Sequence, residues 1–384
     1  MQRKLLVLAI AGVFGAPAAM AADGNVSIYG TASASFDITN NGAAVNGQSA
    51  NKLSSNESNL GVKGSTDLGS GYTAMFQVES AIALDGTPAA NATATTAPML
   101  GTKLAGRDTF LGLSGSFGTV LAGTHDTPYK MATRNMDVFA NTLADNRSLT
   151  SLHNSRVGNV LAYISPKISD STTIAAALVM GAETPAGAAP IKGSAASIAA
   201  MYASGPISAA VAYQTVTLGS AGTGSLAVNG INTFYGTAYV ANDKLSAFKV
   251  GAGYTMDKLT VNLGLERATY SPATPGALST NQTNLYIGGK YGVSSNGTVK
   301  AAYGKMGSTA AAGALANGAT QISIGYDHSL AKSTTVYALY TKLSNDAAGT
   351  AGLGQTADGE ITGATLGGAK GAPSAISVGM KYSF

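Results

Sequence analysis

The chain has no cysteine, no tryptophan, only three histidines and little charge. Without cysteine, no disulfide framework stabilises a chain of this size. Charged residues make up 11% and hydrophobic residues 45%, whereas about a quarter of a soluble domain is charged. No stretch reaches the ~18 apolar residues that a membrane-spanning helix needs. Because backbone polar groups in lipid must all be paired, a membrane protein without such helices has to be a closed barrel.

The sequence also lacks the motifs of an enzyme or a nucleic-acid-binding protein. No HExxH or G-x-S-x-G motif accompanies His125, His153 or His328. His153 stands beside Asn154 and Ser155, but neighbouring side chains point apart and no orienting acid is evident. The glycines form no phosphate-binding loop, and the net charge of +4 comes without a basic run. We predict a protein that is not an enzyme, needs no cofactor or metal, and does not bind nucleic acid.

An export signal is predicted at the N-terminus. Arg3 and Lys4 precede an apolar core from Leu5 to Phe14, and Ala19-Met20-Ala21 fits an A-x-A cleavage site. The apolar core is too short to span a membrane. We expect residues 1–21 to be a signal peptide and residues 22–384 to be the mature protein.

Both ends of this mature region alternate with the period of a β-strand. From Ile376 to Phe384 every second residue is apolar and the others are small or polar, and Val26 to Ile38 alternates in the same way. Successive strand side chains point to opposite faces, so one face suits lipid and the other suits water. A half-buried strand of a soluble sandwich gives the same pattern, so the rest of the chain has to decide. If the protein is a barrel, Ile376–Phe384 should close it by pairing antiparallel with Val26–Ser35.

Short and long connections alternate along the chain. Short turns are predicted near 67–71, 116–118, 166–171, 205–206, 256–258, 295–297 and 331–333, and long Gly/Ala/Thr-rich loops near 185, 224, 275, 313 and 358. This alternation is typical of an outer-membrane barrel, with the short turns on one rim and the long loops on the other. We predict an all-β, transmembrane antiparallel β-barrel of about 16 strands. The count is open between residues 228 and 256, where Phe234–Val240 is either a strand or part of a loop.

Thr124 to Ser155 does not alternate, although it lies between two predicted strands. About thirty residues without strands are unusual inside a compact domain. A barrel can hold such a segment in its lumen, so we predict that residues 124–155 fold inward and form a constriction loop.

Several motifs resemble the general diffusion porins of Gram-negative bacteria, in particular those of Neisseria and Burkholderia relatives. The resemblance is carried by Ser58–Gly64, Asp67–Gly69, Ala74–Ser80, Phe110–Val120, Arg156 with the strand that follows it, and the terminal Tyr382-Ser383-Phe384. It implies a sixteen-stranded barrel, a homotrimer, and a water-filled pore for small hydrophilic solutes. It also implies a multi-pass protein of the bacterial outer membrane, in contact with lipid and lipopolysaccharide. The C-terminal strand is similar to the signal read by the barrel assembly machinery.

The resemblance also implies where the pore is charged, since arginines on the wall of such porins face acidic groups on the loop. Arg107 and Arg156 occupy wall-arginine positions, and Asp137 and Asp145 are the candidate acidic groups on the loop. By strand parity Lys63 and Glu79 point inward as well. Asn59 and Thr124 stand where the family pattern has arginine. We therefore predict weak charge selectivity, set by these eight residues, and anionic if Lys63 reaches the constriction.

Two other functions remain open. The barrel could be a platform for an adhesin or phage receptor, which the long loops would suit. Those loops are poor in the aromatic and arginine anchors that binding surfaces use. A substrate-specific channel is the third possibility. Such a channel would have a track of aromatic side chains along its lumen, which a chain without tryptophan does not favour.

Overall fold

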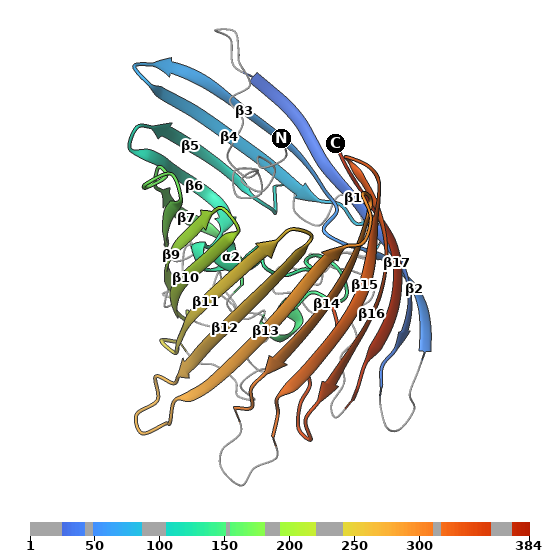
Figure 1. Ribbon diagram of the computed structural model, residues 1–384. Helices are drawn as coiled ribbons and strands as arrows, with labels where there is room; N and C mark the ends of the chain where they lie inside the picture. Colours follow the sequence, from blue (N-terminus) through green and yellow to red (C-terminus); the bar gives the residue numbers. More distant parts are fainter. Residues whose placement is uncertain are drawn as a thin grey trace.

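The computed structural model describes residues 25–42, 49–86, 105–150, 154–180, 193–219, 241–309, 316–354 and 371–384. The predicted signal peptide and the open region Phe234–Val240 lie outside these residues. The described part is almost entirely β-structure, and Figure 1 shows its strands as one continuous curved wall. The strands are β1 (Asn25–Asn40), β2 (Ser49–Ser55), β3 (Asn59–Gly69), β4 (Tyr72–Ala81), β5 (Thr109–Gly115), β6 (Gly118–Asp126), β7 (Arg156–Ile164), β8 (Thr172–Val179), β9 (Ser194–Ser204), β10 (Ile207–Thr217), β11 (Lys244–Met256), β12 (Leu259–Ser271), β13 (Thr280–Gly292), β14 (Gly297–Met306), β15 (Ala319–Ala331), β16 (Thr334–Asn345) and β17 (Ser374–Ser383).

The sheet closes on itself through β1. Apart from β2 and β3, every strand pairs antiparallel with the next along the chain, and the last strand, β17, pairs with β1. On its other edge β1 pairs with both β2 and β3, so these two form one strand interrupted at residues 56–58. The 17 strand segments therefore make 17 − 1 = 16 barrel strands. This confirms the predicted antiparallel barrel of 16 strands.

The register of the closure differs from the predicted one. β17 pairs with residues Thr31–Asn40 of β1, and the first part of β1 pairs only with β3. Closing a barrel requires the strands to tilt and to stagger against one another, so two partners of one strand are shifted along it. Phe384 completes the closure, because its backbone N–H and C=O both bond to Gly30 at 3.0 Å.

Side chains alternate between an apolar outer face and a polar inner face. On β1, Phe36 and Ile38 are about half exposed, whereas Ser35, Asp37 and Thr39 are buried. Exposed apolar residues recur in the same way on the other strands. Such a surface suits lipid, while the inner face carries the polar and charged groups.

The connections confirm the predicted alternation. The short turns join β3–β4, β5–β6, β7–β8, β9–β10, β11–β12, β13–β14 and β15–β16, and the longer connections join the remaining pairs. Because consecutive strands are antiparallel, all the short turns lie on one rim. One strand segment was missed: β2 begins at Ser49, inside a polar stretch that the sequence suggests is a loop up to about Asn51.

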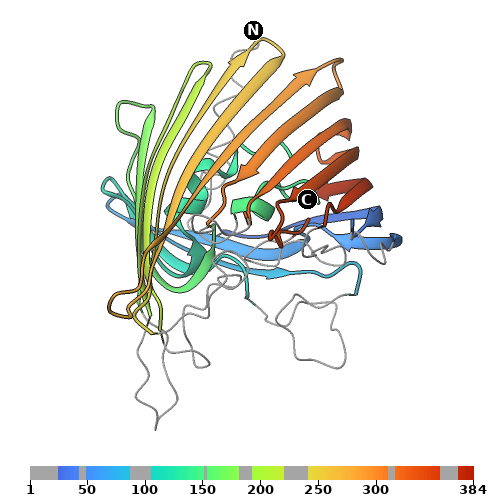
Figure 2. The same cartoon turned by 90° about the horizontal axis from the view of Figure 1, so that it is seen from below.

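The segment between β6 and β7 holds two short helices, α2 (Pro128–Arg134) and α3 (Arg147–Thr150). Figure 2 shows them inside the ring of strands. The side chain of Thr127 caps α2 by accepting a hydrogen bond from the N–H of Lys130 at 3.2 Å, and Pro128 opens the first turn. Threonine as cap and proline at the first position favour a helix start. The sequence predicts no regular structure here, because seven residues are too few to show a helical period.

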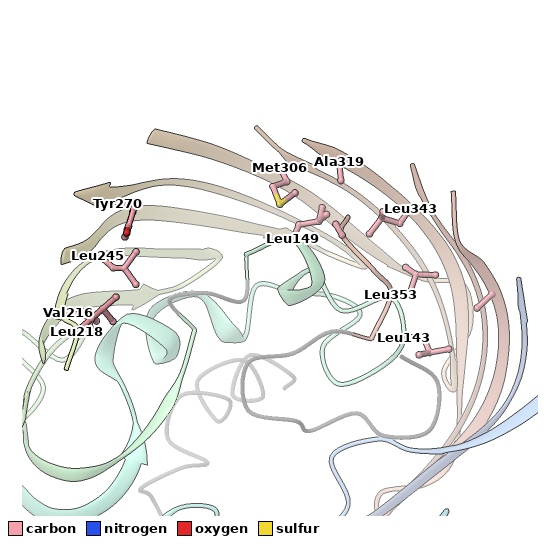
Figure 3. Packing of buried hydrophobic residues seen from close by; sticks show 12 residues of the cluster. Leu143, Leu149, Val216, Leu218, Leu245, Tyr270, Met306, Ala319, Leu343 and Leu353 are labelled. Carbon is pink, nitrogen blue, oxygen red and sulfur yellow. The ribbon is translucent and has the colours of Figure 1, made fainter. Parts of the chain in front are cut away.

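A buried apolar cluster lies where this inner segment meets the wall (Figure 3). Leu143 and Leu149 of the inner segment join wall residues that include Leu245, Tyr270 and Leu343. Burying a leucine side chain contributes roughly 1.5–3 kcal/mol, so the cluster holds the segment against the wall. Within the described residues no helix is long and apolar enough to cross a membrane.

Candidate pore constriction

The segment from Thr127 to Ser155, hereafter the inner loop, is bonded to the wall from several strands. The N–H of Tyr129 donates to the hydroxyl of Ser197 at 2.9 Å. The side-chain amide of Asn262 donates to the carbonyl of Met136 at 2.8 Å, and the N–H of Val138 donates to the Tyr286 hydroxyl at 2.9 Å. These bonds come from β9, β12 and β13, so the inner loop is held against the part of the wall from β9 to β13.

Arg107 lies between two carboxylates of the wall. Its Nε donates to Oε1 of Glu79, and its terminal nitrogen is 3.7 Å from Oε1 of Glu57. The backbone N–H of Arg107 also donates to the carbonyl of Glu79 at 3.0 Å. The Arg107 side chain is only 7% exposed, and a charge-assisted hydrogen bond of this kind is roughly twice as strong as a neutral one.

Glu79 also accepts a hydrogen bond from a tyrosine. The hydroxyl of Tyr29 donates to Oε2 of Glu79 at 2.8 Å. Lys63 lies beside this pair, with its Nζ 4.9 Å from the centre of the Tyr29 ring. Lys63 is exposed to the lumen and has no carboxylate partner among the residues that the structure describes.

Arg156 is held in a second group of charges next to the first. Its Nε donates to Oδ1 of Asp108 at 2.7 Å and lies 3.1 Å from Oδ1 of Asp126. Lys130 of α2 shares Asp126 at 3.0 Å. Burial by itself would raise the pKa of Asp108, but Arg156, His125 and Lys130 together outweigh it and hold that pKa below its ordinary value. Asp108 follows Arg107 directly in the chain, so the two groups adjoin.

The inner loop has its own ion pairs. Asp145 is fully buried, 3.0 Å from Arg134 and 2.9 Å from Arg147. Burial would raise the pKa of Asp145, but the two guanidinium groups prevail and keep it well below its usual range. Both arginines also donate to Oδ1 of Asn141. The Asn141 amide in turn donates to Oε2 of Glu57, and this contact joins the inner loop to the wall group around Arg107.

Asp137 has neutral partners. Its Oδ1 accepts hydrogen bonds from the N–H of Phe139 at 2.9 Å and the hydroxyl of Tyr286 at 3.1 Å, and its Oδ2 accepts one from the N–H of Asn146 at 2.9 Å. Burial, together with the negative charge of Asp145, raises the pKa of Asp137 to about 6.

The structure thus brings most of the expected residues to one region, but it pairs them differently. Asp137 and Asp145 were expected to face the wall arginines. Instead Asp145 is neutralised by the two arginines of its own loop, and the wall arginines pair with Glu79, Glu57, Asp108 and Asp126. Of the two positions that depart from the family pattern, Asn59 is buried and donates to the Glu57 carbonyl at 2.9 Å. Thr124 lies in β6, facing Gly158.

Sequence reasoning missed several members of this network. Glu57 and Asn141 sit in segments without a strand pattern, so parity could not orient them. Lys249 and Glu266 sit on the neighbouring strands β11 and β12 and were not singled out. The Nζ of Lys249 donates to Asn154 at 2.8 Å and lies 4.0 Å from the Tyr129 ring centre, and Glu266 accepts from the Tyr129 hydroxyl at 2.6 Å. Both polar side chains occur at inward positions of β11 and β12, which is the one signal that could have found them.

A small cavity of about 50 Å³ lies between the inner loop and β11–β13. Its lining includes Arg134, Arg147, Lys249 and Glu266. A space of this size and polarity suits a few water molecules. Among the described residues no group of three or more His, Asp or Glu side chains could hold a metal ion.

Comparison with known proteins agrees with this architecture. Solved structures of the same fold include the anion-selective porin from Comamonas acidovorans, which is 21% identical, with 94% of this chain and 100% of that one covered and a TM-score of 0.72. They also include the trimer form of OmpT of Vibrio cholerae, which is 16% identical, with 94% and 99% covered and a TM-score of 0.65.

Sequence similarity to a curated protein is more local. The major outer membrane protein P.IB of Neisseria gonorrhoeae is 27% identical over 144 residues, which are 36% of this chain and 36% of that protein. The match therefore spans only about a third of that relative's length. The family model of the Gram-negative porins matches residues 6–348. With a closed 16-stranded barrel and a family match over most of its length, the chain belongs to the Gram-negative porin family and is a multi-pass protein of the outer membrane.

Proposed function

We propose that the barrel is a channel for the passive diffusion of ions and small hydrophilic solutes, with a weak preference for anions. The observation that supports this selectivity is the net charge of the side chains that line the pore. Among the described residues, the charged groups around Arg107, Arg156 and Asp145 contain seven cationic side chains and six acidic ones, for a net charge of 7 − 6 = +1, and Lys249 and Glu266 add one charge of each sign without changing it. The cations are Lys63, Arg107, Lys130, Arg134, Arg147, Arg156 and Lys381, and the acids are Glu57, Glu79, Asp108, Asp126, Asp137 and Asp145.

Pairing makes the selectivity weak. Charges of opposite sign that lie within about a Debye length, ~8–10 Å at physiological salt, largely cancel for an ion farther away. Most of the lining charges are less than 4 Å from an opposite charge. What remains is a small positive excess, to which the unpaired Lys63 contributes most directly. The predicted loop 124–155 begins three residues too early, because residues 124–126 belong to β6. In this proposal the inner loop, Thr127–Ser155, sets the narrowest point of the pore, near Arg107 and Arg156.

The assembly of the channel is also proposed. A homotrimer is supported by the porin family and by the trimer form recorded for OmpT of Vibrio cholerae. The exposed apolar strand faces suit lipid, and lipopolysaccharide and the barrel assembly machinery are the partners expected for such a surface and C-terminal strand. Porins are channels, and nothing in this proposal requires a chemical reaction. No described feature favours the adhesin or the substrate-specific channel over diffusion.

The test is a planar-bilayer recording of the purified protein in a KCl gradient. The proposal expects ohmic single channels whose reversal potential gives a chloride-to-potassium permeability ratio slightly above 1. Asn59→Arg adds a cation beside Glu57 and should raise the ratio. A closed barrel without conductance, or a strong cation preference in the parent channel, would contradict the proposal.

A further inference from the structure

Tyr29 is an uncharged side chain of the wall that bonds to the charged network. The Tyr29 hydroxyl donates to Oε2 of Glu79, and the other oxygen of this carboxylate accepts from Nε of Arg107. Glu79 is thus bonded through both oxygens, on one side by β1 and on the other by the residue that leads into β5. A carboxylate bonded through one oxygen can rotate, whereas one bonded through both cannot without losing a bond.

The reach of Tyr29 across β3 depends on a glycine. Tyr29 pairs with Gly61 of β3, and Gly61 pairs with Glu79 of β4, so the tyrosine has to pass over Gly61 to meet the carboxylate. A Cβ at position 61 would lie 2.3 Å from Cζ of the Tyr29 ring and 2.5 Å from its hydroxyl. Any larger residue at 61 would therefore displace the ring.

We propose that Tyr29 is a positioning residue of the charge filter, because its hydroxyl holds the Glu79 carboxylate against Arg107 and Gly61 provides the space for it. This inference deepens the proposed function and rests on it. Glu79 is only 7% exposed, so an oxygen that loses its internal donor has to find a water molecule or another cation.

A cation on the same side of the wall is Lys63, which lies over the Tyr29 ring, two residues from Gly61 along β3. In the parent protein the Tyr29 hydroxyl occupies Oε2 of Glu79. Without the hydroxyl, Glu79 is free to turn toward the lumen and toward Lys63. Lys63, which has no carboxylate partner among the described residues, is then neutralised, and the pore shifts toward cations although no formal charge has changed.

A matched control exists on the far side of the closure. Tyr337 of β16 lies over Gly379 of β17 in the same way, since a Cβ there would be 2.4 Å from its Cζ. Its hydroxyl accepts a hydrogen bond from the neutral amide of Asn56 at 3.1 Å. Tyr337→Phe therefore removes a hydroxyl from the same arrangement without releasing a carboxylate.

The experiment measures the chloride-to-potassium permeability ratio of Tyr29→Phe, Tyr337→Phe, Glu79→Gln and the double variant Tyr29→Phe/Glu79→Gln in bilayers. Folding is checked by far-UV circular dichroism. We expect Tyr29→Phe to lower the ratio by at least about 1.5-fold, a small change for potentials of the size found in charged clefts. Tyr337→Phe should leave the ratio unchanged, and adding Tyr29→Phe to Glu79→Gln should have no further effect, because the carboxylate through which it acts is gone.

Each other result has a definite meaning. If Glu79→Gln shifts the ratio and Tyr29→Phe does not, the charge filter stands and the positioning role of Tyr29 is wrong. If Tyr29→Phe acts equally in both backgrounds, the hydroxyl does not work through Glu79 and the inference also fails. If neither Glu79→Gln nor Arg107→Ser shifts the ratio, the proposed filter itself is wrong. Should Tyr29→Phe not fold, Gly61→Ala displaces the same ring and is expected to shift the ratio in the same direction.

Discussion

Removing the charge of Arg107 is the most direct perturbation of the proposed filter. Arg107→Ser deletes the guanidinium that lies between Glu79 and Glu57. The lining then has six cations and six acids, so its net charge falls from +1 to zero. Glu79 and Glu57 also lose their shared partner and become available to passing cations. The channel should move toward cations.

The magnitude follows from Coulomb's law. An ion passing about 8 Å from a unit charge in water interacts with it by roughly 0.5 kcal/mol. At physiological salt, where the Debye length is about 8 Å, screening leaves roughly 0.2 kcal/mol. The sign is opposite for potassium and chloride, so losing one charge should lower the chloride-to-potassium permeability ratio about twofold. At about 0.01 M salt the same charge is hardly screened, and the change should approach fourfold.

The assay is the reversal potential in KCl gradients at these two salt levels. Arg107→Lys is the matched control, because it keeps the charge while losing the planar fork, and its ratio should stay close to that of the parent. If the ratio for Arg107→Ser does not change at either salt level, the reasoning is refuted, since a charge that lines the constriction must act on the ions that pass it. An equal change at both salt levels would also refute it, because a direct electrostatic effect is screened by salt, whereas a structural rearrangement is not.

Three further predictions concern the inner loop and the closure. Because the pKa of Asp137 is raised from 3.8 to about 6, the folded protein binds this proton more tightly than the unfolded chain. The free energy of unfolding should therefore fall as pH rises from 3.8 to about 6. The anion preference should grow as pH falls through about 6, because Asp137 then loses its negative charge. Asp137→Asn should abolish this pH dependence of the reversal potential. Asp145→Asn leaves Arg134 and Arg147 without their carboxylate, which costs about 3–5 kcal/mol for a buried pair, so thermal unfolding should occur at lower temperature and open-channel noise should rise. Deleting Phe384 removes the two backbone bonds to Gly30, and we expect a lower yield of assembled barrel on refolding; an unchanged yield would contradict the role of this residue in closure.

The strands could be predicted from the sequence because lipid enforces a simple rule. Any residue that points outward from a barrel has to be apolar, so the period of two appears in β1 and β17 without help from tertiary contacts. The turns follow for the same reason, since each strand has to end once it has crossed the membrane. The parity of Lys63 and Glu79 also came from this rule.

The missed elements are those that the rule does not govern. The β2 segment follows a Gly- and Asn-rich stretch, and its identity depends on pairing with β1, which is visible only in the closed sheet. The short α2 helix depends on a cap and a proline, signals that are too local to stand out. The closure register depends on the stagger of all the strands together, so no single strand encodes it.

The ion pairs could not be predicted from the sequence for a further reason, which concerns the backbone conformation of two of the residues involved. Glu57 and Asn141, whose side chains join the wall to the inner loop, both have left-handed backbone conformations with φ of 62°. Such a conformation costs a residue such as glutamate roughly 1–2 kcal/mol, whereas asparagine adopts it more readily, and at Glu57 it persists where surrounding contacts impose it. Here the imposing contacts are the charged groups themselves: Arg107 and Lys381 at Glu57, and Arg134 and Arg147 at Asn141. The path of the inner loop and the pairing of the charges therefore determine each other. A pore built in this way satisfies its arginines within its own wall, and only a small excess charge is left for the ions that pass through it.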